Sequence, residues 1–378
     1  MKIPFNKPYT TGKELNYIQD SINRSKISGD GYYTKKVHEF IEETFHTHKA
    51  LLTTSGSTAL DMAALLLNLQ PEDEVILPSY TFVSTVNPFL IAGAKIVFAE
   101  IKEDTLNIDP EDIKRKITSR TKAIVPVHYA GVACDMDAIM EIANKNDIKI
   151  VEDAAQGVNA KYKGKYLGTI GDMGCYSFHE TKNYSCGEGG AILINKDKEL
   201  IERAEIIREK GTNRSKFFRG EIDKYTWVDI GSSYLPSDML AAFLYAQFEQ
   251  LDEINNKRKF IFNYYYENLK DLEDRGILRL PIIPEGRECN AHMFYILLNS
   301  EKERNDLMSK LKEKGIHAVF HYIPLHTAPM GLKMGYKVGD LPITENLSGR
   351  LLRLPMYADL KNSELNYIID KIHNLLLK

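Results

Sequence analysis

Short hydrophobic segments alternate with segments of helical periodicity between residues 50 and 194, and this alternation constrains the fold more than any other feature of the chain. The hydrophobic segments are rich in Val, Ile and Leu, as buried strands are, and the segments between them have about the dozen residues typical of helices. Strands that are joined by helices in this order form a mainly parallel sheet with helices on both faces. The sequence therefore predicts an α/β fold.

The expected elements cover most of the chain. Strands are predicted at residues 50–53, 74–77, 95–99, 123–127, 148–152, 174–177 and 191–194, and further strands at 293–298 and 317–320. Helices are predicted at residues 12–25, 34–45, 57–68, 81–92, 110–117, 137–146, 237–268 and 303–314, and from 362 onward. Because the pattern changes near residue 278, we expect a large domain over residues 1–250 and a smaller C-terminal α+β domain over residues 251–378.

The composition argues against several classes of partner. The 378 residues carry a net charge of -3, so the chain lacks the basic field that attracts nucleic acid. No run approaches the roughly 18 apolar residues that cross a membrane, and the first residues lack the apolar core of a signal peptide. The four cysteines show no metal-ligand spacing. We therefore expect a cytoplasmic protein without a metal site, a nucleic-acid partner or a membrane partner.

Two phosphate-binding motifs that are common in α/β proteins are absent. No Gly-x-Gly-x-x-Gly follows the first predicted strand, and no Walker loop occurs in the sequence. Both motifs bind phosphates through a glycine-rich loop at the start of a helix. Their absence argues against a nicotinamide-dependent dehydrogenase and against an ATPase.

An acidic residue and a lysine in the middle of the chain suggest a cofactor. Asp153 ends a predicted buried strand, and Lys182 lies in the polar loop after the strand at residues 174–177. An enzyme that uses pyridoxal phosphate needs such a pair, because the lysine amine forms a Schiff base with the cofactor and the carboxylate keeps the pyridine nitrogen protonated. Taken singly, Asp153 could be a helix cap and Lys182 a solvated surface lysine.

Three other segments add groups that such a cofactor needs. Residues 54–60 (Thr-Ser-Gly-Ser-Thr-Ala-Leu) mark a strand-to-helix turn, where backbone N–H groups bind phosphate. Residues 78–83 (Pro-Ser-Tyr-Thr-Phe-Val) offer an aromatic ring that could stack on the pyridine, and Gln156 and Ser177 offer hydrogen bonds. Each segment alone has an ordinary interpretation, as a helix cap, a core aromatic residue, a surface amide or a loop serine. Their order along the chain favours a cofactor site.

Three motifs carry a resemblance to a known family. They are Ser-Gly-Ser-Thr-Ala-Leu at residues 55–60, Glu-Asp-Ala-Ala-Gln at 152–156, and Thr-Lys-Asn at 181–183 running into Gly-Glu-Gly-Gly at 187–190. Over nearly its whole length the sequence resembles the DegT/DnrJ/EryC1/StrS family of sugar aminotransferases, which implies the pyridoxal phosphate fold of type I. The runs at residues 78–85, 126–134, 177–184, 208–215 and 321–326 are most similar to the members that form dTDP-4-amino-4,6-dideoxygalactose.

The resemblance implies a role for each motif residue. Lys182 is expected to hold the cofactor and to act as the catalytic base, with Asp153 as the partner of the pyridine nitrogen. The other expected cofactor contacts are Gln156 at the phenolic oxygen, Phe82 at the ring face, and Gly56, Ser57, Thr58 and Ser177 at the phosphate. Many members also carry an asparagine, in a Gly-x-Asn-x-Arg segment, that reaches the phosphate in the neighbouring subunit. Here Ser233 takes its place, with a shorter side chain and without the arginine.

Histidines are candidates for contacts with the sugar. His179 is close to Lys182 in the sequence, and His321 and His326 lie near the expected seam between the two domains. The alternative for each of them is a structural histidine. A zinc site is not expected, because no third ligand has suitable spacing.

The resemblance implies a ping-pong aminotransferase. L-glutamate is the expected amino donor, a nucleotide-linked 4-keto-6-deoxyhexose such as dTDP-4-keto-6-deoxyglucose is the expected acceptor, and a homodimer is the expected assembly. The product is expected to enter a surface polysaccharide, such as O-antigen or enterobacterial common antigen. Amination at C3, or formation of the 4-amino gluco epimer, is an alternative because the sequence does not reveal how the sugar lies. The non-enzyme alternative is a regulatory protein that binds pyridoxal phosphate, although the presence of Lys182 favours turnover.

Overall fold

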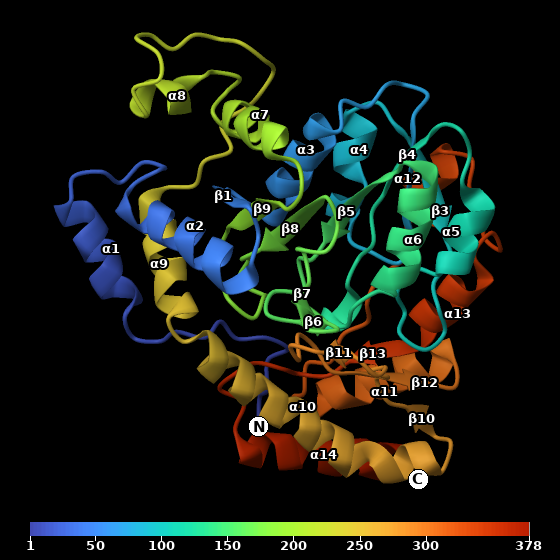
Figure 1. Ribbon diagram of the computed structural model, residues 1–378. Coiled ribbons are helices and arrows are strands. Elements are labelled where there is room, and N and C mark those ends of the chain that lie inside the picture. Colours follow the sequence, from blue (N-terminus) through green and yellow to red (C-terminus); the bar gives the residue numbers. More distant parts are fainter. Residues whose placement is uncertain (378) are drawn as a thin grey trace.

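A seven-stranded sheet forms the centre of the molecule in a computed structural model that describes residues 1–377 (Figure 1). Its strands are β1 (Lys49–Thr53), β2 (Glu74–Pro78), β3 (Lys95–Ala99), β4 (Thr121–Ile124), β5 (Lys149–Asp153), β8 (Met173–Ser177) and β9 (Gly190–Ile194). They lie in the order β1-β9-β8-β5-β4-β2-β3. β9 runs antiparallel to both of its neighbours, and the other neighbouring strands pair in parallel. The predicted α/β fold with a mainly parallel sheet is confirmed.

Helices cover both faces of this sheet. They are α1 (Glu14–Asn23), α2 (Tyr32–Phe45), α3 (Gly56–Leu66), α4 (Asn87–Ile91), α5 (Pro110–Lys116), α6 (Met136–Asn146), α7 (Lys198–Arg208), α8 (Arg214–Phe218) and α9 (Asp238–Phe248), with 3-10 turns η1 (Val83–Thr85) and η2 (Tyr129–Gly131). Side chains along a strand point alternately to the two faces. In β1, Leu52 therefore joins the core under α2, α6 and α9, whereas Leu51 joins the core under α3, α4 and α7. Burial on both sides explains why the strands read as continuous hydrophobic runs.

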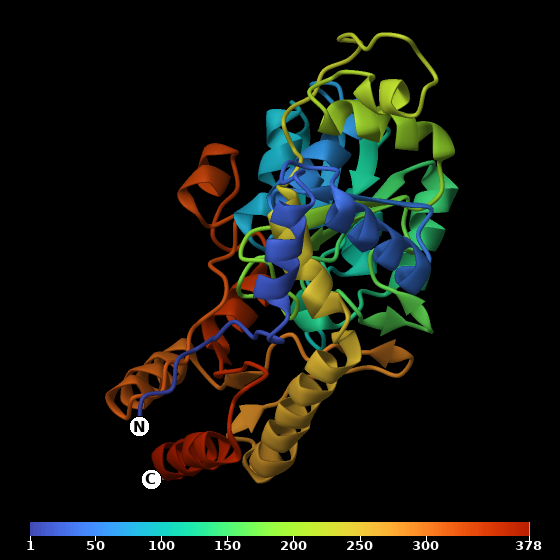
Figure 2. The ribbon, with the colours of Figure 1, turned by 90° about the vertical axis from the view of Figure 1, so that its left-hand side faces the viewer.

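The C-terminal part adds a second layer below the sheet (Figures 1 and 2). It contains α10 (Leu251–Asp274), α11 (Glu301–Glu313), α14 (Asn362–Leu376) and a sheet of β10 (Leu278–Arg279), β12 (Tyr295–Leu298) and β13 (Leu351–Arg353). Ile3 lies in the core of this layer and forms a parallel bridge with Ile316, so the first residues of the chain belong to the C-terminal layer. The remaining elements are α12 (Pro329–Lys333), α13 (Pro342–Arg350) and a small sheet of β6 (Lys161–Tyr162), β7 (Lys165–Tyr166) and β11 (Arg287–Glu288).

Three expected elements differ from the structure. The helix predicted at residues 237–268 is interrupted at Glu249 and Gln250, between α9 and α10. The helix predicted at 81–92 is reduced to η1 and α4, because Thr81 and Thr85 bond through their hydroxyls and Pro88 can occupy only the first turn of a helix. The strand predicted at 317–320 is only an isolated bridge, between Val319 and Arg353.

Residues 1–377 contain neither a membrane-spanning helix nor a cluster of metal ligands. Among these residues no helix combines the length and the apolar character that a membrane span requires. The same residues contain no group of at least three His, Cys, Asp and Glu side chains arranged to hold a metal ion. All four cysteines are free thiols, and only Cys289 is not fully buried.

Candidate active site

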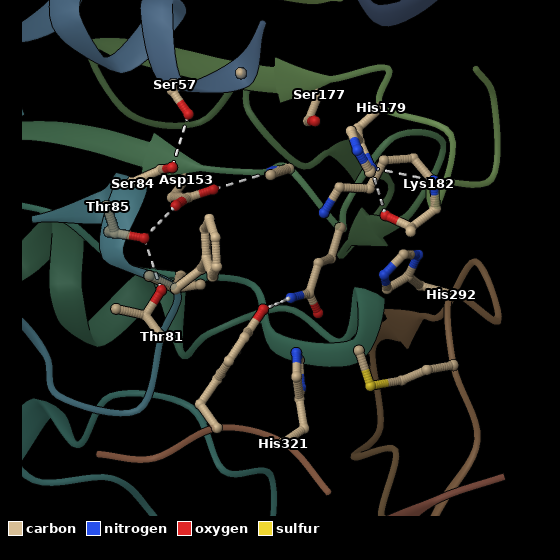
Figure 3. Close-up of a pocket in the computed structure, with 18 of the residues that line it drawn as sticks. Ser57, Thr81, Ser84, Thr85, Asp153, Ser177, His179, Lys182, His292 and His321 are labelled. Atoms are coloured by element: carbon tan, nitrogen blue, oxygen red, sulfur yellow. Dashed lines mark hydrogen bonds between the residues drawn. The ribbon is translucent and has the colours of Figure 1, made fainter. Parts of the chain in front are cut away.

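A cavity of about 410 Å³ lies at the carboxyl edge of the central sheet, between the sheet and the C-terminal layer. The ends of β5 and β8, the segment after β2 and the N-terminus of α3 form one side of it (Figure 3). Segments of the C-terminal layer and the start of the chain, including Phe5 and Asn6, form the other side. In open α/β sheets the carboxyl ends of parallel strands commonly carry the ligand site.

Asp153 ends β5 and presents a carboxylate to this cavity. The residue is only 6% exposed. The Thr85 hydroxyl donates to Oδ2 at 2.7 Å, and the Ala155 backbone N–H donates to Oδ1 at 3.1 Å. Thr81 in turn bonds Thr85, hydroxyl to hydroxyl, at 2.6 Å. Both carboxylate oxygens are therefore held in place while the group still faces the cavity.

Lys182 extends its ammonium into the same cavity (Figure 3). Its backbone is fixed by a hydrogen bond from its N–H to the His179 carbonyl at 2.9 Å. Burial lowers the pKa of Lys182 to about 8. The negative charge of Asp153 acts against this change, whereas the positive charge of Arg353 makes a smaller contribution in the same direction as burial. Nζ makes no hydrogen bond or ion pair with any described residue. A lysine in this state is available as a nucleophile and as a base.

The N-terminus of α3 forms the turn at which a phosphate is expected. Ser55 caps the helix, accepting from the Thr58 backbone N–H at 3.1 Å. The Thr58 hydroxyl bonds back to the Ser55 N–H at 2.9 Å, so Thr58 serves the cap and does not line the cavity. Gly56 and Ser57 do line it. A Cβ on Gly56 would lie 2.8 Å from the Cβ of Ser177, so the close approach of the two segments requires glycine.

Ser57 and Ser177 present hydroxyls beside this turn. The Ser57 hydroxyl donates to the Ser84 hydroxyl at 2.7 Å, and Ser177 ends β8 next to Gly56. The helix N-terminus supplies unpaired backbone N–H groups and a favourable field for an anion. This corner of the cavity therefore has the donors that a phosphate group requires.

Phe82 and Gln156 also line the cavity. Phe82 is 56% exposed, and its ring centre lies 6.2 Å from that of Tyr322. Gln156 accepts from the Ala130 backbone N–H at 2.7 Å and donates to the Tyr322 hydroxyl at 3.3 Å. The Gln156 amide is thus fixed by the protein, whereas the Phe82 ring remains open to a ligand.

The candidate histidines fall into two groups. His179 and His321 line the cavity, and burial holds the pKa of His321 well below its usual range. His326 lies outside it and is fully buried, with Nδ1 2.7 Å from the Ser79 hydroxyl and Nε2 2.9 Å from Glu345. His326 therefore fastens the loop before α12 to the end of β2 and does not face the cavity.

Ser233 does not line the cavity of its own chain. It is exposed and forms an isolated antiparallel bridge with Glu209, beyond the end of α7.

The structure adds cavity residues that the sequence did not single out. Thr85 holds Asp153, and Tyr322 holds Gln156. His292 lines the cavity beside Lys182, with Nδ1 3.0 Å from the Asn183 side-chain oxygen. Arg353 reaches the cavity from β13. Thr85 has a local signal, since it closes the run at residues 78–85, whereas no short motif surrounds His292 or Arg353.

The residues present fit pyridoxal phosphate. The cavity combines a lysine amine without a protein partner, a buried carboxylate held at both oxygens, and a helix N-terminus where only glycine fits. These are the groups that hold the aldehyde, the pyridine nitrogen and the phosphate of that cofactor, respectively.

Comparisons with known proteins identify the family of the chain. The profile of the DegT/DnrJ/EryC1/StrS aminotransferase family matches residues 8–373. GDP-perosamine synthase of Escherichia coli O157:H7 is 33% identical over 374 residues, which cover 98% of each chain. The "Pleiotropic regulatory protein" of Geobacillus stearothermophilus is 34% identical over 95% of this chain and 93% of its own.

A solved structure shows the same fold. The putative sugar aminotransferase Spr1654 from Streptococcus pneumoniae, in its PMP form, superposes with a TM-score of 0.93 at 25% identity and covers 100% of this chain and 98% of its own. The predicted fold of type I is thereby confirmed. The protein belongs to the DegT/DnrJ/EryC1/StrS aminotransferase family, and its cofactor is pyridoxal phosphate, as the sequence predicted.

Proposed function

We propose that the protein transfers an amino group from L-glutamate to C4 of a nucleotide-linked 4-keto-6-deoxyhexose. The acceptor proposed is dTDP-4-keto-6-deoxyglucose, and the product is dTDP-4-amino-4,6-dideoxygalactose. The runs at residues 78–85, 126–134, 177–184, 208–215 and 321–326 support this acceptor. A relative named GDP-perosamine synthase supports a nucleotide-linked sugar in general. The destination proposed for the product is a surface polysaccharide.

One observation carries the proposal. Lys182 directs an amine without a protein partner, with its pKa lowered to about 8 by burial, into a cavity that also holds the Asp153 carboxylate. An amine with a pKa near the working pH can both accept and return a proton during each cycle. A binding protein has no need of such a group.

The residues of this chain divide the chemistry between them. When bound, pyridoxal phosphate supplies the electron sink that stabilises the charge left when a C–H bond next to the nitrogen breaks. The amine of Lys182 anchors the resting cofactor, takes the proton from the α-carbon of the donor and later delivers a proton to C4 of the sugar. Asp153 supplies the negative charge that keeps the pyridine nitrogen protonated. Gly56, Ser57 and Ser177 hold the phosphate end.

The sugar contacts proposed follow from the cavity. His179 and His321 line it and carry polar nitrogens, so they are proposed as sugar contacts. His326 is not proposed again, because its ring is taken up by Ser79 and Glu345. We also propose a homodimer, in which Ser233 of one subunit approaches the phosphate in the other. The exposed position of Ser233 is compatible with that contact.

An amination assay tests the proposed function. The holoenzyme is supplied with L-glutamate and either dTDP-4-keto-6-deoxyglucose or a GDP-linked 4-keto-6-deoxyhexose, and the C4 configuration of the product is assigned by NMR. The expected result is a 4-amino-4,6-dideoxygalactose product from the dTDP-linked sugar at a higher kcat/KM. A gluco product, amination at C3 or preference for the GDP-linked sugar would replace the substrate named here.

A regulatory role is the second candidate, because one relative bears the name "Pleiotropic regulatory protein". A sensor would bind the cofactor but would not cycle it. The purified protein should be yellow and should lose that colour when L-glutamate is added. Colour that persists in glutamate, and in other amino acids, would favour the regulatory role.

A further inference from the structure

Arg353 carries a half-buried positive charge that no carboxylate of the described residues neutralises. Its side chain lines the cavity, and its Nε–H is buried without a hydrogen-bond acceptor. Within residues 1–377 no carboxylate forms an ion pair with the guanidinium, and no oxygen accepts a hydrogen bond from it. The guanidinium carbon lies 4.6 Å from the centre of the Phe5 ring. A partly buried cation in this state is costly unless another group supplies an anion.

Other arginines with a buried N–H group do not share this state. Four more have a buried N–H without an acceptor: Arg208, Arg279, Arg287 and Arg304. Each of them has a partner elsewhere on its guanidinium, namely Asp30, the Glu103 carbonyl, Asp135 and Glu301 in the same order. Of the five, Arg353 alone lines the cavity. The only one of these five guanidinium groups that has no partner among the described residues is therefore the one at the cavity.

The backbone holds Arg353 firmly in this position. Residue 353 ends β13, where it pairs with Tyr295 of β12. It also exchanges two backbone hydrogen bonds with Val319, at 2.7 and 3.1 Å. The side chain therefore starts from a fixed point on a rigid strand, as a binding residue should.

The groups around the guanidinium offer no internal anion. Burial lowers the pKa of Arg353, and the polar groups that act on it are the hydroxyls of Tyr129, Tyr322 and Tyr80. An arginine remains charged despite such a change. Two acids line the cavity. Both oxygens of Asp153 already accept hydrogen bonds, from Thr85 and Ala155, and Glu188 lies 3.6 Å from His179 Nε2 and forms no ion pair with Arg353.

We propose that Arg353 binds the carboxylate of the amino donor, so that the cavity selects an α-amino acid over a simple amine. This inference rests on the proposed transfer from an amino acid and names the residue that recognises it. A planar guanidinium binds a carboxylate through two parallel hydrogen bonds. Arg353 is also close enough to Lys182 for its positive charge to lower the pKa of the lysine.

Arg353 suits the donor carboxylate better than the sugar diphosphate, because fewer covalent bonds separate the carboxylate from the reacting carbon. In an α-amino acid the carboxylate is bonded directly to the carbon whose proton Lys182 removes. In the sugar nucleotide the diphosphate is attached at C1, and the hexose ring separates it from the reacting C4. An anion-binding group beside Lys182 therefore suits the donor.

Half-reaction kinetics with the holoenzyme test the proposal. Wild type, Arg353→Gln and Arg353→Lys are mixed with L-glutamate, and the loss of the cofactor absorbance is followed by stopped flow. We expect the apparent Kd for glutamate to rise on the order of 100-fold in Arg353→Gln, with a smaller rise in Arg353→Lys. The second half-reaction, with the keto-sugar, should keep its KM. Arg304→Gln is the matched control, because Arg304 also has a buried N–H group and a nearby aromatic ring but lies outside the cavity.

The outcomes separate the alternatives. A change confined to the keto-sugar half-reaction would assign Arg353 to the diphosphate and overturn the proposal, as would unchanged kinetics in both halves. Thermal unfolding of each variant shows whether it is folded, and the milder Arg353→Lys serves if the glutamine variant is not. If the wild type reacts with glutamate but forms no amino sugar, the proposed acceptor fails and the role of Arg353 stands. If the wild type reacts with no amino acid, both fail.

Discussion

Thr85 donates a hydrogen bond of 2.7 Å to the carboxylate of Asp153, although the two residues lie 68 positions apart in the chain. Thr85 closes a 3-10 turn after β2, and Asp153 ends β5. The contact spans the position of β4, which lies between β2 and β5 in the sheet, and it fixes the acid that is expected to face the pyridine nitrogen. The sequence predicted Asp153 as a site residue but did not single out Thr85, which holds it.

Replacing Asp153 should abolish most of the chemistry without unfolding the protein. Asp153→Asn keeps the shape and the hydrogen bond from Thr85 but cannot supply the charge that keeps the pyridine nitrogen protonated. We expect the half-reaction with glutamate to slow by ~100-fold or more. Stopped-flow absorbance measures the rate. Asp147→Asn, at an exposed left-handed position after α6, is the control and should behave as wild type. A near-normal rate in Asp153→Asn would show that another group protonates the ring.

Replacing Thr85 should weaken the same function more mildly. Thr85→Val has nearly the same shape but removes the donor to Asp153, and a hydrogen bond to a charged group is worth about 1.5–3 kcal/mol, or roughly 10-fold to 100-fold in rate. Thr85→Ser retains the hydroxyl and should recover most of the rate. If valine and serine have equal effects, packing at this position matters and the hydrogen bond does not.

Much of the fold was predictable because its signals are local. Strands such as β2 and β9 are buried on both faces, so their hydrophobic runs show in the sequence almost to the residue. The break between α9 and α10 was not predictable, because helical periodicity continues through Glu249 and Gln250. There Glu249 accepts from Lys13 and Tyr17, which lie far away in the sequence. Tertiary contacts of this kind leave no local pattern.

The site divides in the same way. Asp153, Lys182 and the turn at Gly56 each follow an element that periodicity reveals, and the structure brings them to one cavity. Arg353 and His292 come from the C-terminal layer, and their position depends on how that layer packs against the sheet. The sequence indicated that His326 lies near the seam between the two domains. It could not show that the two ring nitrogens of His326 bond Ser79 and Glu345.

His326 should therefore matter for stability and not for sugar affinity. Its removal in His326→Ala takes away the imidazole that bonds both Ser79 and Glu345, each of which keeps only a backbone donor, at a cost of about 2 kcal/mol in the free energy of unfolding. Chemical denaturation measures this cost. His179→Ala is the matched comparison: this exposed cavity residue should leave stability unchanged and raise the KM for the keto-sugar. The reverse pattern would return His326 to the substrate site.

The pH dependence of cofactor attachment should reflect Lys182. Only the neutral amine attacks the aldehyde, and burial lowers the pKa of Lys182 to about 8. The rate at which the cofactor-free protein binds pyridoxal phosphate should rise with pH, with a midpoint near 8, and level off above it. A rate that still rises toward pH 10 would mean that the amine titrates like an ordinary solvated lysine.

The most direct test is to locate the covalent link to the cofactor. The holoenzyme is reduced with sodium borohydride, digested and mapped by mass spectrometry, with Lys182→Ala treated in parallel. We expect one pyridoxyl adduct, on Lys182, and none in the variant, which should also lose measurable turnover. An adduct on another lysine, or transamination that survives in Lys182→Ala, would contradict the account.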